Sequence, residues 1–159
     1  MANGSSVVEE GLLELCLTRR VAAPAEVVFR AWIEPKHLAE WWGPKGFTNP
    51  VCEVDARVGG VIRVDMRTPN GLVHPMVGRF VEIDRPHRLV FWACPLDETG
   101  RPILEVLNSV TFAEVCGGTE IALVATVTKM TPAGEKPVGG MSQGWSESLD
   151  RLAELVLKM

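Results

Sequence analysis

Apolar and polar residues alternate along most of the chain, which is the pattern of strands that bury one face. Strands are predicted over residues 12–21, 51–55, 61–67, 73–84, 89–94, 105–115 and 119–129. The turns between the later strands are short, and Asn70-Gly71 is a strong hairpin signal. Strands joined in this way predict an antiparallel meander of about six to seven strands.

Apolar residues at helical spacing follow the first strand and return at the C-terminus. Pro24 and Pro35 each open a short helix, because a proline at the first helical position loses no hydrogen bond. A long amphipathic helix is predicted from Met141 onward. The proline- and glycine-rich stretch 131–140 is expected to be a linker into it.

These elements predict the α+β class, with a curved antiparallel sheet wrapped on the long C-terminal helix. We expect a short disordered lead over residues 1–11 and one domain over 12–159. A helix covers a strip about 10 Å wide, whereas six strands span roughly 24 Å or more. We therefore expect an apolar cavity between sheet and helix, although side chains could also fill that space.

Composition and charge limit the classes of partner. The net charge is −4 and no Lys/Arg block exceeds two residues, so no nucleic-acid partner is expected. No run of 18 apolar residues or secretory signal occurs, so we expect no membrane insertion and a cytoplasmic location. The four cysteines form no Cys-x-x-Cys pair and the three histidines lack metal-ligand spacing. No cofactor or metal is therefore expected.

Several segments carry a family resemblance. Residues 18–32, TRRVAAPAEVVFRAW, and 34–44, EPKHLAEWWGP, resemble the START-like (SRPBCC, helix-grip) superfamily. Gly59-Gly60 before an alternating strand, and Gly144-Trp145 opening the last helix with Ser148-Leu149, extend the likeness over about residues 12–157. It points to the branch named after the activator of the heat-shock-chaperone ATPase. The resemblance implies a helix-grip fold, but the superfamily ranges from lipid carriers and polyketide cyclases to co-chaperones, so fold alone fixes no function.

Candidate ligand-binding residues come from the aromatic segment after the second helix and from the inward strand faces. Two of them, His74 and Asn108, are polar groups in phase with apolar neighbours and would need a hydrogen-bond partner, which a ligand, water or solvent exposure could supply. The aromatic residues could equally form a packed seal at the end of the sheet. The full set is Trp41, Trp42, Phe47, Ile62, Val64, Met66, His74, Met76, Phe91, Asn108, Val110, Met141 and Trp145.

The sequence therefore predicts a binding domain for an apolar or aromatic small molecule. One alternative is a polyketide-cyclase-like enzyme, for which His74 is the only acid–base candidate; no catalytic residue is assigned. A second alternative is a chaperone-associated stress-response domain, which predicts an exposed apolar patch on the outer sheet face. Chaperone contact has no support from an extra domain in this sequence, and a homodimer stays open.

Overall fold

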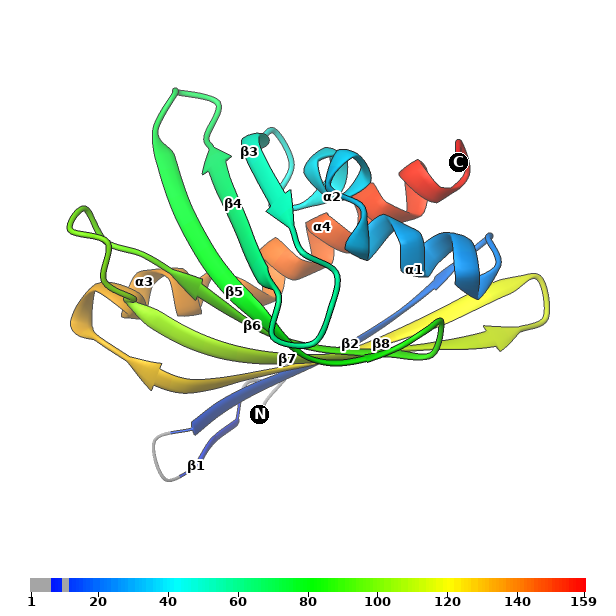
Figure 1. Cartoon of the computed structure of the whole chain (residues 1–159). Coiled ribbons are helices and arrows are strands. Elements are labelled where there is room, and N and C mark those ends of the chain that lie inside the picture. The colour runs from blue at the N-terminus through cyan, green and yellow to red at the C-terminus, as the bar shows by residue number, and fades with distance from the viewer. Residues whose placement is uncertain (1–6, 10–11) are drawn as a thin grey trace.

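The computed structural model describes residues 7–9 and 12–159, and its elements follow the predicted order (Figure 1). Eight strands lie in these residues: β1 (Val7–Glu9), β2 (Leu12–Val21), β3 (Thr48–Val54), β4 (Val61–Arg67), β5 (Val73–Asp84), β6 (Arg88–Pro95), β7 (Leu104–Val115) and β8 (Gly118–Met130). The helices are α1 (Ala25–Ile33), α2 (Pro35–Trp41), the 3-10 turn η1 (Pro132–Gly134), α3 (Glu135–Gly139) and α4 (Met141–Val156). The predicted α+β, helix-grip arrangement is confirmed.

All the described strands form one antiparallel sheet in the order β1-β2-β8-β7-β6-β5-β4-β3. Because β2 and β3 lie far apart in this order, the chain between them must cross the sheet. Helices α1 and α2 make that crossing, and with α4 they cover the concave face around which the sheet curls (Figure 1). Local hairpins therefore build the sheet from β3 to β8, whereas the β2–β8 pair joins strands far apart in the sequence.

Alternation of side chains places the core on the concave face. In β7 and β8 every second residue is buried over 104–112 and 119–127. Two apolar clusters result among the described residues. The larger includes α1, α2 and the C-terminal part of α4, and the smaller is formed by Leu15, Leu104, Val106, Ala125 and Val127.

Gly78 helps the sheet to curl. A Cβ at this position would collide with the carbonyl oxygen of Trp92 on the neighbouring strand β6. Only glycine permits that close backbone approach, and glycine within a strand is typical of a sharp bend. The bend brings β4 and β5 toward the helices on the concave side (Figure 1).

Two expectations need correction. The stretch 131–140 is not an open linker, because η1 and α3 occupy residues 132–139; Pro132 stands in the first turn of η1, where a proline is tolerated. Within the expected disordered lead, residues 7–9 form strand β1 against β2, and the rest of that lead lies outside the described residues. Within the described part of the chain, no helix is long and apolar enough to cross a membrane.

Candidate functional site

Five aromatic residues, which we call the aromatic cluster, fill the space between the sheet and α4: Trp32, Trp41, Trp42, Phe91 and Trp145. The Trp32 ring centroid lies 4.6 Å from that of Trp41 and 6.0 Å from that of Trp145. Trp42 lies 5.3 Å from Trp145 and 6.3 Å from Phe91. The cluster thus joins α1, α2, β6 and α4.

The interior is close-packed, and the expected preformed cavity is absent at this place. The space enclosed beside Trp32, Trp42, Ile62 and Phe91 is about 10 Å³, far below the roughly 300–1,000 Å³ of a small-molecule pocket. Two short helices and four indoles cover the width of sheet that α4 leaves open. A larger hollow of about 420 Å³ lies elsewhere, as an open groove along residues 102–105 and 129–131.

Asn108 is a polar group in this apolar interior. Its side chain is on the inward face of β7 and is fully buried. The Nδ2 group donates weakly to the carbonyl oxygens of Phe91 and Val106, at 3.4 and 3.5 Å. The Oδ1 atom accepts no hydrogen bond from any described residue. An unpaired buried acceptor costs about 1–3 kcal/mol, so a hydrogen-bond donor at this atom would stabilise the protein.

Trp32 presents the complementary polar atom. Its residue is only 3% exposed, and its Nε1–H group finds no acceptor in the described part of the chain. The neighbouring Trp41 differs, because its Nε1–H donates to the carbonyl oxygen of Ala31 at 2.9 Å. One buried indole is therefore satisfied and the other is not.

The two apolar clusters meet at this point. Asn108 lies between Val106 of the smaller cluster and Val110 of the larger one along β7. Trp145 packs against both clusters from α4. The junction therefore combines a buried polar group on the sheet with the half-buried Trp145 indole of α4.

The other predicted residues divide by burial. Those that are buried in the larger cluster are Ile62, Val64, Met76 and Val110. Phe47, Met66 and Met141 are half-buried, the first two near Gly43 and the third beside the smaller cluster. His74 is exposed although it shares the strand face of the buried Met76, so solvent can satisfy its polar atoms. It pairs with Met66 on the β4–β5 hairpin, whose tip extends past the helices (Figure 1).

Two residues of α4 fix the loop that carries Trp42. The Arg151 guanidinium donates to the carbonyl oxygens of Glu40, Gly43 and Pro44 at 2.9, 2.9 and 3.0 Å, and more weakly to that of Trp42. Burial lowers the pKa of Arg151 from its usual value. Its charge lies at the C-terminal end of α2, where carbonyl groups carry partial negative charge. One turn earlier, Glu147 accepts from the Lys45 amide at 3.0 Å.

The sequence patterns missed Trp32 and Arg151. Trp32 belongs to the apolar stripe of α1, which predicts burial but not whether its N–H has a partner. Arg151 lies on the polar side of a helix, where a solvent-facing cation is the usual expectation. Neither role has a local signal, since both depend on segments remote in sequence.

Titratable groups contribute little to the interior. Burial, and to a lesser extent the nearby Glu53, raises the pKa of the half-buried Cys52 thiol to about 11. Cys52 pairs with Val64 at the edge of the larger cluster. It therefore stays protonated near neutral pH and lines the core as an apolar group rather than a nucleophile.

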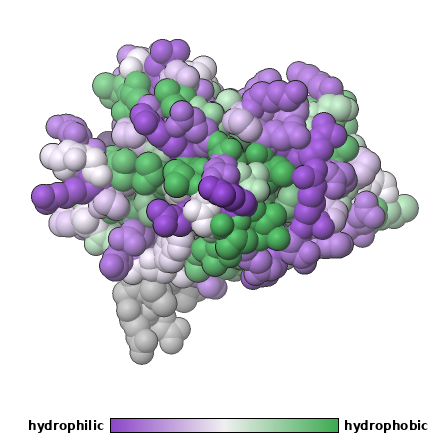
Figure 2. All heavy atoms as spheres, viewed as in Figure 1, coloured by the Kyte–Doolittle hydropathy of each residue, from purple (hydrophilic) through white to green (hydrophobic). Residues whose placement is uncertain are grey.

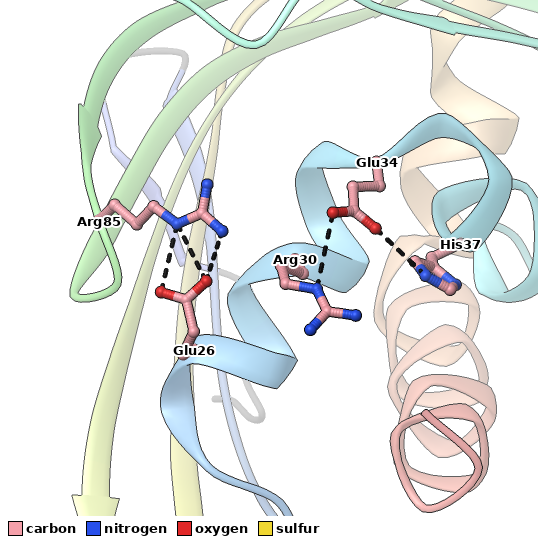
Figure 3. Close-up of polar contacts among 5 residues, drawn as sticks. All are labelled: Glu26, Arg30, Glu34, His37 and Arg85. Atoms are coloured by element: carbon pink, nitrogen blue, oxygen red, sulfur yellow. Dashed lines mark hydrogen bonds and ion pairs between the residues drawn. The ribbon is translucent and has the colours of Figure 1, made fainter.

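Charged residues gather instead on the outer side of α1 (Figure 3). Glu26 accepts from Arg85, 3.0 Å from its Nε, and this hydrogen bonding lowers the pKa of Glu26. Glu34 lies 3.6 Å from Arg30 and 3.2 Å from His37. Such exposed pairs fix side-chain positions but stabilise a fold little.

The surface seen from the same side as in Figure 1 is not uniformly polar. Figure 2 shows hydrophobic residues across the middle of that surface, bordered by hydrophilic ones.

Comparison with known proteins agrees with this geometry. Residues 22–157 match the family described as activator of Hsp90 ATPase homolog 1-like protein. A crystal structure from Chromobacterium violaceum is 31% identical, covers 90% of this chain and 96% of its own, and has a TM-score of 0.77. One from Nitrosomonas europaea is 28% identical over 95% of this chain and 97% of its own, with the same TM-score. One from Silicibacter pomeroyi, described as an AHSA1 protein, is 25% identical over 92% and 99%, with a TM-score of 0.74.

A search of curated proteins gives no match to the chain. The family match spans most of the sequence, including both helices of the crossing, the aromatic cluster and α4. The matches to the solved structures likewise extend over nearly the whole length of those chains. The chain therefore belongs to the activator of Hsp90 ATPase homolog 1-like family of the START-like superfamily.

Proposed function

We propose that this chain binds a small, largely apolar molecule between its sheet and α4. The observation that carries the proposal is the Oδ1 atom of Asn108, which is fully buried and accepts no hydrogen bond from a described residue. A purely structural core would be more stable with an apolar residue there. A ligand that donates a hydrogen bond would satisfy this atom while its apolar part contacts the aromatic cluster.

Family membership alone supports a ligand-binding or a chaperone-associated domain in general. The unpaired interior acceptor favours the first. The cyclase-like alternative requires an acid–base group in the interior, and its only candidate, His74, is exposed. The close packing requires that the ligand displaces side chains, which limits it to a compact molecule.

Thermal unfolding of the whole chain tests the proposal. The probes are indole, benzimidazole, 2-naphthol, myristate and cholesterol, because they differ in size and in hydrogen-bond groups. At a concentration of about 100 times Kd, a bound ligand adds about 2.7 kcal/mol, which gives a measurable rise in Tm. We expect at least one compact donor-bearing probe to raise Tm.

Asn108→Leu is the decisive variant, because it removes the acceptor and keeps an apolar side chain of similar size. We expect it to lose most of the ligand-induced rise in Tm. Ser109→Ala is the matched control, since Ser109 lies next in β7 on the opposite face and should respond like the wild type. The proposal would be overturned if none of the probes raised the Tm of the wild-type protein.

A further inference from the structure

The convex face of the sheet lies opposite Asn108 and the aromatic cluster. We propose that the outward side chains of β6, β7 and β8 bind a second copy of this chain, and that the two copies are related by a two-fold axis along β7. The inference is independent of the proposed ligand, because it uses the other face of the sheet.

The first observation is that the middle of this face carries no charge, although charged residues make up 23% of the sequence. Charged residues of β6, β7 and β8 lie only toward the strand ends, as do Arg88, Glu105 and Glu120. Helices α1, α2 and α4 cover the opposite, concave face (Figure 1). An uncharged centre with charges around it is typical of a protein–protein interface. The outward residues of this centre are Val90, Trp92, Cys94, Leu107, Ser109, Thr111, Ala113, Ala122, Val124, Thr126 and Thr128.

The second observation is that side-chain size differs on the two sides of β7. Trp92 on β6 is large, whereas the outward residues of β8 around the same level are Ala122, Val124 and Thr126. Two sheets that pack face to face keep their strands nearly aligned, about 10 Å apart. Because β6 and β8 flank β7, a two-fold axis along β7 places β6 of one copy over β8 of the other. Each Trp92 indole then lies against smaller side chains, and the two Leu107 side chains meet at the axis.

The third observation is a pair of opposite charges at equal distances from β7. Arg79 on β5 is the cross-strand neighbour of Trp92, and Glu14 on β2 is that of Thr126. The same axis places β5 over β2, so Arg79 of each copy faces Glu14 of the other. Both residues are exposed, and neither forms an ion pair with a described residue. Both side chains are long enough to bridge the wider gap that the curvature of the sheet leaves away from the axis.

These observations favour a second copy over a different protein. In a two-fold interface the same surface must be complementary to itself, so each feature needs its counterpart at the mirrored distance from the axis. Large faces small across β7, and positive faces negative one strand further out. One axis satisfies both pairs, and opposite charges at the rim fix the orientation of the two copies.

Sedimentation velocity of the whole chain over a range of concentrations tests the inference. We expect a species of twice the mass of one chain. Leu107→Glu places two carboxylates at the axis and should raise the Kd of the dimer at least about tenfold, because like charges in contact repel. Val73→Glu is the matched control, since Val73 is an apolar strand residue, 50% exposed, at the far end of β5. A wild type that stays monomeric at its highest soluble concentration would overturn the inference.

Charge reversal tests the position of the axis without a change in the apolar centre. Arg79→Glu and Glu14→Arg should each raise the Kd of the dimer at least about tenfold, because each brings like charges together in both symmetry-related pairs. An equal mixture of the two variants should form a heterodimer, since opposite charges then meet in both pairs. The double variant Arg79→Glu with Glu14→Arg should also regain the wild-type Kd.

The exposed positions of Arg79 and Glu14 keep this test valid even if Leu107→Glu fails to fold, which circular dichroism would show. A dimer whose Kd ignores both single reversals, or that neither the mixture nor the double variant restores, would overturn the axis along β7.

Discussion

The two parts of α4 are attached to the rest of the protein very differently. In the C-terminal part, Leu149 and Leu152 are fully buried and Val156 is 3% exposed. Its polar side also reaches across the fold, since Arg151 binds the loop after α2 and Asp150 pairs with Arg19 of β2. Before Glu147 no residue of the helix is buried.

This contrast shows how one helix can serve both stability and binding. The C-terminal part closes the larger apolar cluster and holds the loop beside it, so it cannot move without loss of the core. The N-terminal part contributes the half-buried Trp145 indole, which packs against both apolar clusters. Segments with little buried surface open at lower free energy than the global fold, and ligand-linked motions use such segments.

The largest expected effect comes from shortening a buried side chain in the C-terminal part of α4, compared with the same change in its N-terminal part. Leu152→Ala should lower the free energy of unfolding by about 3 kcal/mol, because it leaves a cavity at a fully buried site. Met141→Ala, at a half-buried site, should cost less than about 1 kcal/mol. Urea denaturation followed by circular dichroism measures both, and equal costs would contradict the difference in attachment.

Loss of the Arg151 contacts should have the next largest effect. Arg151→Met keeps the apolar stem but removes the donors to the carbonyl groups around Gly43, so we expect a loss of about 2 kcal/mol. Hydrogen exchange should also become faster at the Lys45 amide. Arg20→Met is the control, because Arg20 is 73% exposed in its one ion pair and should change stability by less than about 0.5 kcal/mol. Unchanged exchange at Lys45 would argue against the anchoring role.

Asn108→Leu should change stability in the opposite direction. Removal of the unpaired acceptor should raise the free energy of unfolding by about 1 kcal/mol, which corresponds to a rise of about 2–4 °C in Tm. Calorimetry without ligand measures this gain. A destabilised variant would mean that the weak bonds of Nδ2 outweigh the cost of the unpaired Oδ1 atom.

The smallest expected effect is a change in stability at Gly144, in the N-terminal part of α4. Gly144→Ala should stabilise the protein by about 0.5–1 kcal/mol, because alanine favours the helix and its Cβ meets only Pro44, at an ordinary distance. Gly118→Ala is the contrasting variant, since its Cβ would collide with the Val21 carbonyl oxygen and should destabilise. Urea titrations of the two variants should therefore shift in opposite directions.

Sequence patterns predicted the strands well where local signals were strong. The predicted bounds 12–21, 61–67 and 73–84 agree with β2, β4 and β5, because alternation and turn residues are both local. The inward phase of Asn108 was also predicted, and its burial is confirmed. Its role toward a ligand stays a prediction. The helical turns within 131–140 have no clear local signal, because a stretch rich in proline and glycine is typical of a linker, although the first turn of a helix tolerates proline.

The amino-acid sequence by itself determined the α+β class, the antiparallel order of the hairpins and which side chains face inward, since periodicity and turn chemistry act over a few residues. The tertiary structure alone decided that four indoles fill the expected cavity, that Trp32 and Asn108 lack partners, and that Arg151 anchors a distant loop. These features depend on the packing of segments far apart in the chain, because the volume left between a sheet and its helices is set by how side chains from both interlock.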